Sequence, residues 1–340
     1  MNVLIVGGCG YIGSHLIKLL LDARHQVVIL DDLSSGFRDA LLGGELVVGD
    51  CADRAVLDEL FTRHAFDGVL HFASFIQVGE SVVDPAKYYQ NNVAKTLALL
   101  EAMRDHGVRN LIFSSTAAVF GNPQYTPIDE KHPLAPINPY GWSKRMVEQM
   151  LADFEHAYGL RWAALRYFNA AGADPLARIG ERHEPETHLI PLALQAASGR
   201  RGALKVFGRD YDTPDGTCIR DYVHVDDLAS AHLLALEHLW RGGASGAFNL
   251  GNGQGFSVQQ VLDTVARVTG RAVPHEDAPR RAGDPARLVA DAGLAHSVLG
   301  WVPQYAELQT IVEHAWAWEQ RMATAESQPQ AGIGATVAVA

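Results

Sequence analysis

The turn from Gly7 to Gly13 constrains the fold of this chain more than any other feature. An apolar run, residues 3–6, leads directly into it, and an amphipathic stretch, residues 12–23, follows. In such a strand–turn–helix unit, Gly7 permits the tight turn, Gly10 lets the backbone approach a pyrophosphate, and Gly13 lets the helix pack close to the strand. The segment therefore predicts a dinucleotide-binding unit built on a parallel sheet.

Short apolar runs alternate with amphipathic segments through the rest of the first half. This alternation is typical of an α/β fold with a Rossmann-type, doubly wound parallel sheet. The expected strands are residues 3–6, 26–30, 45–48, 68–72, 110–114 and 162–167. The expected helices are residues 12–23, 54–64, 85–106 and 143–158.

The pattern changes after Asn169, because residues 170–186 are rich in glycine, proline and charge and predict a long loop. Further helices are expected at 189–198, 225–238, 257–269 and 308–322, with strands at 204–207 and 221–224. We predict a cofactor-binding Rossmann domain over residues 1–169, with strands near 221–250 returning to it. A smaller, interleaved α/β substrate lobe is expected over residues 170–322, and a disordered tail over residues 323–340.

Composition and charge exclude several classes of protein. The net charge is −11 and no run of Lys and Arg is longer than a pair, which argues against a nucleic-acid surface. No apolar run is long enough to span a membrane. The three cysteines, Cys9, Cys51 and Cys218, never form a C-x-x-C pair, which argues against a disulfide framework and a structural zinc site. The first strand leaves no room for a signal peptide, so we expect a cytoplasmic protein.

Two acidic residues follow the early strands. Asp31 comes directly after the second strand, 18 residues beyond Gly13, where its carboxylate can accept both hydroxyls of an adenosine ribose and would repel a 2′-phosphate. This favours NAD over NADP as the cofactor. Asp50 follows the third strand and is interpreted either as an acceptor for the adenine amino group or as a loop-capping residue.

Tyr140 and Lys144 are four residues apart and therefore lie on one face of a helix. A cation held there favours the phenolate, so Tyr140 could act as a base well below its unperturbed pKa of about 10. Thr116 ends the fifth strand, at the sheet edge where ligands bind in open α/β sheets. A solvated helix face for the Tyr–Lys pair and a turn or cap role for Thr116 are the alternatives.

Several motifs together carry a family resemblance. They are residues 7–15, 71–73, 91–93, 113–116, the Tyr140-x-x-x-Lys144 pair, and residues 166–172, 188–191, 207–208, 215–228, 249–251 and 279–284. Over about residues 2–320, the chain resembles the extended short-chain dehydrogenase/reductases and, within them, the UDP-glucose 4-epimerase family.

The resemblance implies an isomerase of galactose metabolism that keeps NAD bound and inverts C4 of a UDP-hexose, UDP-galactose to UDP-glucose, through a transient 4-keto sugar. Tyr140 would take the proton of the 4-hydroxyl, Thr116 would hold the 4-oxygen, and Lys144 would lower the pKa of Tyr140 and bind the nicotinamide ribose. The implied cofactor-binding residues are Gly7, Gly10, Tyr11, Ile12, Gly13, Asp31, Asp32, Asp50, Cys51, Phe72, Ala73, Asn91, Ser114, Tyr140, Lys144 and Tyr167.

The resemblance also implies how the UDP-sugar is held. Arg220 and Arg281 would neutralise the phosphates, and Asp284 would accept a ribose hydroxyl. The implied substrate-binding residues are Thr116, Tyr140, Asn169, His188, Leu189, Phe207, Arg220, Arg281 and Asp284.

Three positions depart from the pattern of some family members. Thr116 replaces a serine, and Ile76 stands where some relatives have a lysine near the cofactor, which predicts weaker retention of NAD. Leu288 stands where relatives carry either a tyrosine or a small residue that gates the sugar pocket. Its intermediate size leaves N-acetylated hexosamines open as substrates.

Other functions stay open at this point. A 4,6-dehydratase needs an acid/base pair after the strand-five threonine, whereas Ala117 and Ala118 follow it here. Epimerases of UDP-N-acetylglucosamine, UDP-glucuronate or UDP-pentoses share the scaffold. A non-catalytic NAD-binding regulator would be expected to have lost Tyr140, Lys144 or Thr116, and all three are present.

The expected helices 85–106 and 143–158 resemble the pair that forms a homodimeric four-helix interface in the family. The apolar residues that would face a partner subunit, or else the core, are Leu97, Leu100, Met146, Met150 and Leu151.

Overall fold

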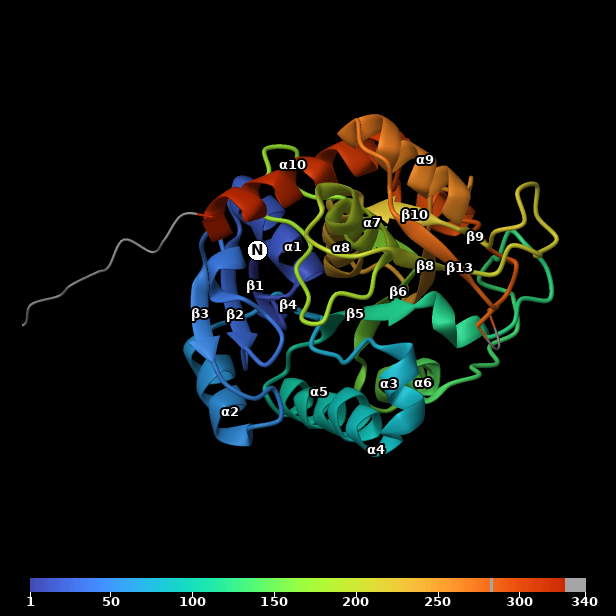
Figure 1. Ribbon diagram of the computed structural model, residues 1–340. Helices are drawn as coiled ribbons and strands as arrows, with labels where there is room; N and C mark the ends of the chain where they lie inside the picture. The colour runs from blue at the N-terminus through green and yellow to red at the C-terminus, as the bar shows by residue number, and fades with distance from the viewer. Residues whose placement is uncertain (282–283, 328–340) are drawn as a thin grey trace, which may run out of the picture.

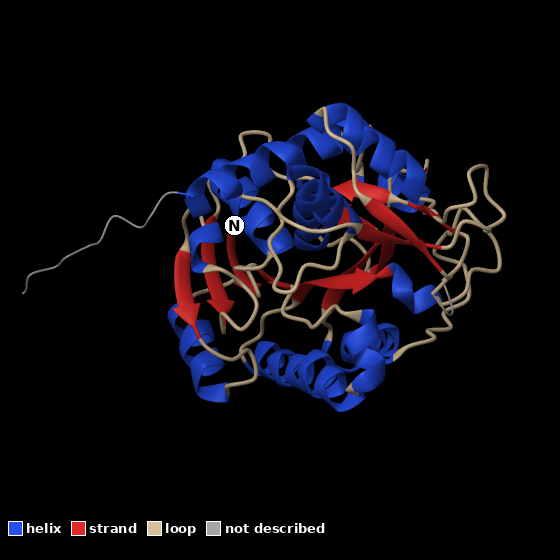
Figure 2. Cartoon of the chain, in the orientation of Figure 1, coloured by secondary structure: helices blue, strands red, loops and turns tan. Residues whose placement is uncertain are grey.

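The computed structural model describes residues 1–281 and 284–327. A seven-stranded sheet forms its centre (Figure 2), and every pairing between its strands is parallel. All six strands expected in the first half belong to this sheet. In spatial order the strands are β11 (Gly246–Leu250), β6 (Arg161–Tyr167), β5 (Asn110–Thr116), β4 (Gly68–His71), β1 (Asn2–Val6), β2 (Gln26–Asp31) and β3 (Glu45–Val48).

Helices cover both faces of the sheet (Figure 1). On one face, α1 (Tyr11–Asp22) and α8 (Val225–Trp240) pack against strand residues such as Ile5, whose side chain is fully buried. On the other face, α2 (Arg54–Arg63), α5 (Lys95–Asp105) and α6 (Pro139–Tyr158) pack against alternate residues such as Leu4. Because side chains alternate along a strand, an apolar run such as β1 supplies both cores at once.

The expected helix 85–106 is interrupted. It consists of α4 (Pro85–Tyr88), a π-helical segment η2 (Tyr89–Ala94) and α5, and the shorter helix α3 (Val78–Val83) precedes it. The interruption coincides with Asn92, whose side-chain amide donates to the carbonyl of Phe75 and to Oγ of Ser143 while its oxygen accepts the N–H of Phe75. A π turn inside a helix re-aims side chains in this way and is frequent at functional sites.

The C-terminal lobe is built from short strands and three helices. The helices α7 (Leu189–Ser198), α9 (Val258–Thr269) and α10 (Leu308–Ser327) enclose a separate apolar core. The strands pair as β7 (Asn169–Ala171) with β10 (Tyr222–His224), β8 (Leu204–Phe207) with β13 (His275–Ala278), and β9 (Ile219–Arg220) with both β12 (Phe256–Ser257) and β14 (Arg287–Leu288). The remaining short helical segments are η1 (Arg38–Ala40), η3 (Ala117–Phe120) and η4 (Ala295–Leu299).

Two expectations for the second half need correction. The strand at 221–224 does not return to the large sheet, because β10 pairs with β7, and the returning strand is β11, which pairs with β6. The tail was expected from residue 323, but α10 continues to Ser327, and the rest of that segment lies outside the described residues. The division into a 1–169 domain and a 170–322 lobe stays a prediction.

Within the described residues, no helix combines the length and the apolar character needed to cross a membrane.

Candidate active site

The glycine turn has the geometry that its sequence predicts. Gly7 has a φ of +81°, and a Cβ there would lie 2.4 Å from the backbone nitrogen of Ala73. A Cβ on Gly13 would lie 2.8 Å from the carbonyl oxygen of Gly7, so helix and strand could not pack as closely with any other residue. At Gly10 the nearest atom to an added Cβ is 3.5 Å away. This glycine is therefore not needed for packing and leaves room for a ligand.

The start of α1 is arranged to meet an anion. In the described chain, no side chain caps this helix after Gly10 and its first turn contains no acidic residue. The N–H groups of Tyr11, Ile12 and Gly13 belong to the helix start, where the helix dipole favours negative charge. A pyrophosphate suits this position.

Asp31 is held at the end of β2 by the glycine turn itself. Its carboxylate accepts the N–H of Cys9 and the N–H of Leu33, both at 2.8 Å. Burial raises the pKa of Asp31, and these backbone hydrogen bonds oppose the shift. Asp32 accepts the N–H of Ser34 at 2.9 Å. The carboxylate of Asp31 is thus fixed beside Gly10, with oxygen lone pairs left for two ribose hydroxyls.

Asp50 caps its own loop, as one of its two interpretations expects. It accepts the N–H of Ala52 at 2.9 Å and pairs with Lys95 at 2.6 Å. Burial alone would raise the pKa of Asp50, and the hydrogen bond from Lys95 turns the shift downward. Cys51, next to it, is buried and free.

Tyr140 lies in the first turn of α6. Pro139 begins the helix, and the side chain of Asn138 accepts the N–H of Gly141 at 2.8 Å, so the sequence fixes where the helix starts. The phenol is buried beside Thr116 at the end of β5. Burial raises the pKa of Tyr140, and a hydrogen bond with Thr116 lowers it in part.

Lys144 lies one turn further along α6 and is 1% exposed. Its Nζ donates to Oγ of Ser74 and to the carbonyl of Ser114, each at 2.8 Å, and lies 4.9 Å from the centre of the Phe113 ring. Burial lowers the pKa of Lys144 to about 7, against a smaller opposing effect of Glu148.

The sequence predicts that Lys144 lowers the pKa of Tyr140. In the structure the pKa of Tyr140 is raised by burial, and the group that opposes this rise is Thr116. Burial acts on both residues, raising the pKa of the phenol and lowering that of the amine. A lysine with a pKa near 7 is charged only in part at neutral pH, so its cation stabilises the phenolate less than the spacing alone suggests.

The other expected cofactor residues lie after β4, on β5 and β6, and in η2. Phe72 and Ala73 follow β4, and both donate their N–H to the carbonyl of Val6. Ser114 and Tyr167 share a short hydrogen bond between the ends of β5 and β6. Asn91 lies in η2, where its side chain donates to Asn92, and Ile76 is exposed in the loop before α3.

The expected diphosphate residues form two contacts in the C-terminal lobe. Arg220 donates to Asp284 at 3.2 Å and to the carbonyl of Pro285 at 2.9 Å. The guanidinium of Arg281 lies 4.0 Å from the centre of the Phe207 ring. The contacts of Arg220 join β9 to the segment before β14. The contact between Arg281 and Phe207 joins that segment to the end of β8.

Leu288 is placed beside this arginine. In the register of β14 and β9 it faces Arg220. It also packs against an apolar cluster that contains Phe120 and Ala117, directly after Thr116. Leu288 is therefore linked to both regions, and its role as a gate of the sugar pocket stays a prediction.

The remaining expected substrate residues lie at element starts. Asn169 begins β7, and its side chain donates to the carbonyl of Asp221 at 2.9 Å. Leu189 begins α7 directly after His188, whose Nδ1 faces the carboxylates of Glu181 and Glu186 at 2.8 and 3.1 Å.

Comparison with known proteins supplies the family. Residues 3–251 match the model of the NAD dependent epimerase/dehydratase family. The chain is 52% identical over 320 residues to the UDP-glucose 4-epimerase of Halalkalibacterium halodurans, covering 94% of this chain and 96% of that protein. The chain belongs to the UDP-glucose 4-epimerase family.

Two solved structures extend the comparison. UDP-glucose 4-epimerase from Brucella ovis in complex with NAD has a TM-score of 0.91 and 52% identity, covering 93% of this chain and 97% of that one. The UDP-Glc/GlcNAc 4-epimerase of Campylobacter jejuni has a TM-score of 0.83 and 44% identity, covering 94% and 99%. The Rossmann-type fold inferred from sequence is thus confirmed.

The residues of this family member fit NAD. The open approach at Gly10, the uncapped start of α1 and the fixed carboxylate of Asp31 together match a pyrophosphate with an adenosine ribose. Lys144, Ser114 and Tyr167 lie together at the ends of β5 and β6, where the sheet's ligand edge places the rest of a dinucleotide.

Sequence reasoning missed a supporting layer beneath the catalytic pair. Glu148 is 3% exposed and accepts Oγ of Ser115 at 2.7 Å and two N–H groups of Arg166 at 2.8 and 2.6 Å. Ser74, which holds Lys144, was also missed. The signal for Glu148 was present, because it follows Lys144 by four residues and so lies on the same helix face.

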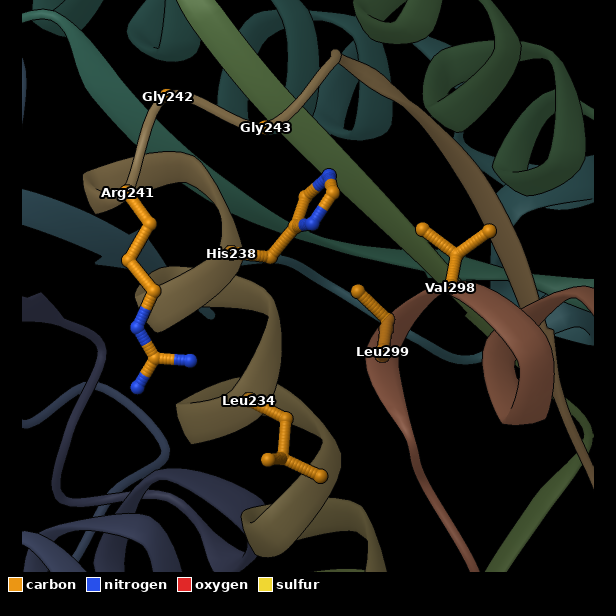
Figure 3. Close-up of a pocket in the computed structure, with 7 residues that line it drawn as sticks. All are labelled: Leu234, His238, Arg241, Gly242, Gly243, Val298 and Leu299. Carbon is orange, nitrogen blue, oxygen red and sulfur yellow. The ribbon is translucent and has the colours of Figure 1, made fainter.

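A hollow of about 300 Å³ lies on the surface between α8 and η4, away from the residues described above (Figure 3). Its lining includes His238, Arg241 and Val298, and the turn that follows leads into the start of β11. The hollow is therefore at the amino-terminal edge of the sheet, opposite the catalytic edge, and carries no part of the active site.

Proposed function

We propose that this chain inverts C4 of UDP-hexoses with NAD and interconverts UDP-galactose and UDP-glucose. The placement of Thr116, Tyr140 and Lys144 carries the proposal. Thr116 ends β5, the phenol of Tyr140 shares a hydrogen bond with it, and Lys144 donates to the carbonyl of Ser114 on the same strand. The high identity to UDP-glucose 4-epimerases over nearly the whole chain supports the same function.

The three catalytic side chains have different tasks in this proposal. Tyr140 takes the proton of the sugar 4-hydroxyl and later returns it, and Thr116 hydrogen-bonds the 4-oxygen. Lys144 binds the nicotinamide ribose and, when protonated, favours the phenolate of Tyr140. NAD, when bound, accepts hydride from C4 and returns it to the opposite face of the 4-keto sugar.

The UDP moiety has to stay fixed while the hexose turns over. We assign this to Arg220 and Arg281 for the diphosphate and Asp284 for a ribose hydroxyl, because guanidinium groups bind phosphate in two-pronged fashion. Binding requires Arg220 to exchange its contact with Asp284 for phosphate. The uridine contacts are assigned to Asn169, Leu189 and Phe207, whereas the imidazole of His188 faces Glu181 and Glu186.

Proton NMR of purified protein with UDP-galactose and no added cofactor tests this function. Formation of UDP-glucose to an equilibrium mixture is expected, with NAD released on denaturation of the protein. Absence of conversion even after NAD is supplied would reject the galactose–glucose reaction.

The N-acetylated sugars are a second candidate range. Leu288 is half-buried against the cluster around Phe120 and is smaller than tyrosine. The Campylobacter relative shows that the fold accommodates both sugar types in one enzyme. Assay of UDP-N-acetylgalactosamine beside UDP-galactose decides the range, and Leu288→Tyr is expected to suppress the N-acetylated substrate selectively.

We also propose a homodimer in the cytoplasm. The expected interface needs correction, because Leu100 and Leu151 are fully buried in the core and Met150 packs against it. Leu97 and Met146 are 40% and 41% exposed and remain available to a partner. The three cysteines are free, in keeping with a reducing compartment. Sedimentation of the wild type and Met146→Glu tests the dimer.

A further inference from the structure

The loop between β7 and α7 gathers four metal-ligating side chains outside the catalytic centre. They are Glu181, His183, Glu186 and His188, and one ligand atom from each lies within 4.8 Å of all the others. All four residues lie within eight positions of one another and are partly or mostly shielded from solvent. We propose that this cluster binds one divalent transition-metal ion, with Zn²⁺ as the best fit.

The distances between the ligand atoms carry the proposal. Nδ1 of His188 lies 2.8 Å from Glu181 and 3.1 Å from Glu186, and Nδ1 of His183 lies 3.4 Å from each of the same carboxylates. Ligands about 2.0–2.2 Å from a tetrahedral Zn²⁺ lie about 3.3–3.5 Å from one another. The four imidazole–carboxylate separations, from 2.8 to 3.4 Å, are thus at or somewhat below the edge length of such a tetrahedron.

His183 gives a second, independent observation. Its Nδ1 atom is buried and makes no hydrogen bond within the described structure, although two carboxylates lie 3.4 Å away. A buried nitrogen of this kind costs free energy unless it is satisfied. The nitrogen lies 3.4 Å from the carboxylates of both Glu181 and Glu186, so a metal ion bound among these three groups would satisfy it.

Charge and ligand type select the ion. The two carboxylates supply two negative charges, which one divalent cation balances when both imidazoles are neutral. Imidazole favours Zn²⁺ and its neighbours in the first transition row, whereas Mg²⁺ prefers oxygen ligands and keeps several waters. The absence of a cysteine pair does not bear on this site, because no thiolate takes part.

The surroundings hold the ligands in place. Glu186 accepts the backbone N–H groups of Thr187 and His188 at 2.7 and 2.8 Å, which orients its carboxylate. The backbone carbonyl of Glu181 accepts Nε1 of Trp318 in α10 at 3.0 Å. The side chain of His183 is 22% exposed, which leaves a route for an ion.

The position of the site gives it a structural task. The ring of His183 packs edge-on against Tyr11, at the start of α1, with 6.2 Å between ring centres. His188 directly precedes α7. A metal ion bound here would join the glycine turn, α7 and, through Trp318, α10 (Figure 1).

Metal uptake by untagged protein tests the proposal. After dialysis against a chelator, the wild type is incubated with Zn²⁺, separated by gel filtration and analysed for metal. One Zn²⁺ per chain is expected, and Co²⁺ as a probe is expected to show the visible absorption of a four-coordinate ion. Mg²⁺ in excess should displace neither the bound Zn²⁺ nor the bound Co²⁺. Failure of the wild type to retain Zn²⁺, or a six-coordinate Co²⁺ spectrum, would overturn the proposal.

Two variants locate the site. His183→Gln and Glu186→Gln each remove one ligand while keeping an amide of similar size, and both should lose stoichiometric Zn²⁺. The matched control is His156→Gln, which removes an exposed imidazole on α6 and should retain the ion. Circular dichroism shows whether each variant is folded. Retention by folded His183→Gln, or equal loss by His156→Gln, would refute the assignment.

Discussion

The two sides of the active site are supported by very different structures. Tyr140, Thr116 and Lys144 rest on β5 and β6, strands of seven residues each, and on a twenty-residue helix. The expected diphosphate residues lie on β9, which has two residues, and in the segment between β13 and β14. The first side is fixed by buried packing and the second by polar contacts near the surface.

This difference suits the two tasks. Proton and hydride transfer need reacting groups held within a few tenths of an ångström, which rigid strands and helices provide. A nucleotide that enters and leaves needs groups that can exchange partners. Arg220 contacts Asp284 in this structure and is proposed to exchange this contact for a phosphate. We therefore expect substitutions on the sheet side to affect the chemical step or stability, and those in the lobe to affect binding.

The largest effect is expected for Tyr140→Phe. The variant keeps the buried ring but loses the hydroxyl that moves the proton, so kcat should fall by about 10²- to 10⁴-fold. KM and the content of bound NAD should change little. Steady-state kinetics with UDP-galactose and absorbance of released NAD measure the three quantities. Activity within a few-fold of the wild type would exclude Tyr140 as the base.

The next effect is on stability, at the buried ion pair of Glu148, one turn beyond Lys144 on α6. Glu148→Ala leaves the guanidinium of Arg166 buried without its carboxylate, which should cost about 3–5 kcal/mol of unfolding free energy. Urea denaturation measures it. Glu155→Ala, on the exposed side of the same helix, removes one hydrogen bond to Trp162 and should cost less than about 1 kcal/mol. Equal losses in the two variants would contradict the assigned role of the buried pair.

A smaller effect on binding is expected in the lobe. Arg220→Lys keeps the charge but loses the two-pronged contact, so KM for UDP-galactose should rise about 10- to 100-fold at nearly constant kcat. Arg209→Lys is the control, since this arginine pairs with Asp277 in the same lobe but lies outside the assigned site. A fall in kcat with unchanged KM would place Arg220 in the chemical step and erase the contrast between the two sides.

The same contrast explains which features the sequence reveals. Gly7 and Gly13 are predictable because each solves a local steric problem, and Asn138 and Pro139 mark the start of α6 through local capping. The pairing of β10 with β7 is set by contacts between distant segments, which no local pattern encodes. Burial, which lowers the pKa of Lys144, likewise depends on segments far away in the sequence, such as that of Ser74, seventy residues earlier, so the spacing from Tyr140 did not predict the pKa.

Lys144 also supplies a graded effect, a dependence of stability on pH. Burial lowers its pKa from the ordinary 10.5 to about 7 in the folded chain. Between these values the unfolded chain binds a proton that the folded chain does not, so the contribution of Lys144 to stability rises with pH. Below pH 7 both states are protonated and the contribution stays at its minimum.

Lys144→Met removes this titration while keeping an apolar stem of similar length. The unfolding free energy of the wild type minus that of the variant should therefore rise between pH 7 and pH 9, by up to about 1.4 kcal/mol per pH unit. Urea denaturation at each pH measures the difference, and Lys131→Met, at an exposed lysine, is the control. A difference that is flat over this range would mean that Lys144 keeps its full charge in the folded chain. The cation would then be available to hold Tyr140 as a phenolate without help from a ligand, and rigid burial on the sheet side would not be what tunes the catalytic pair.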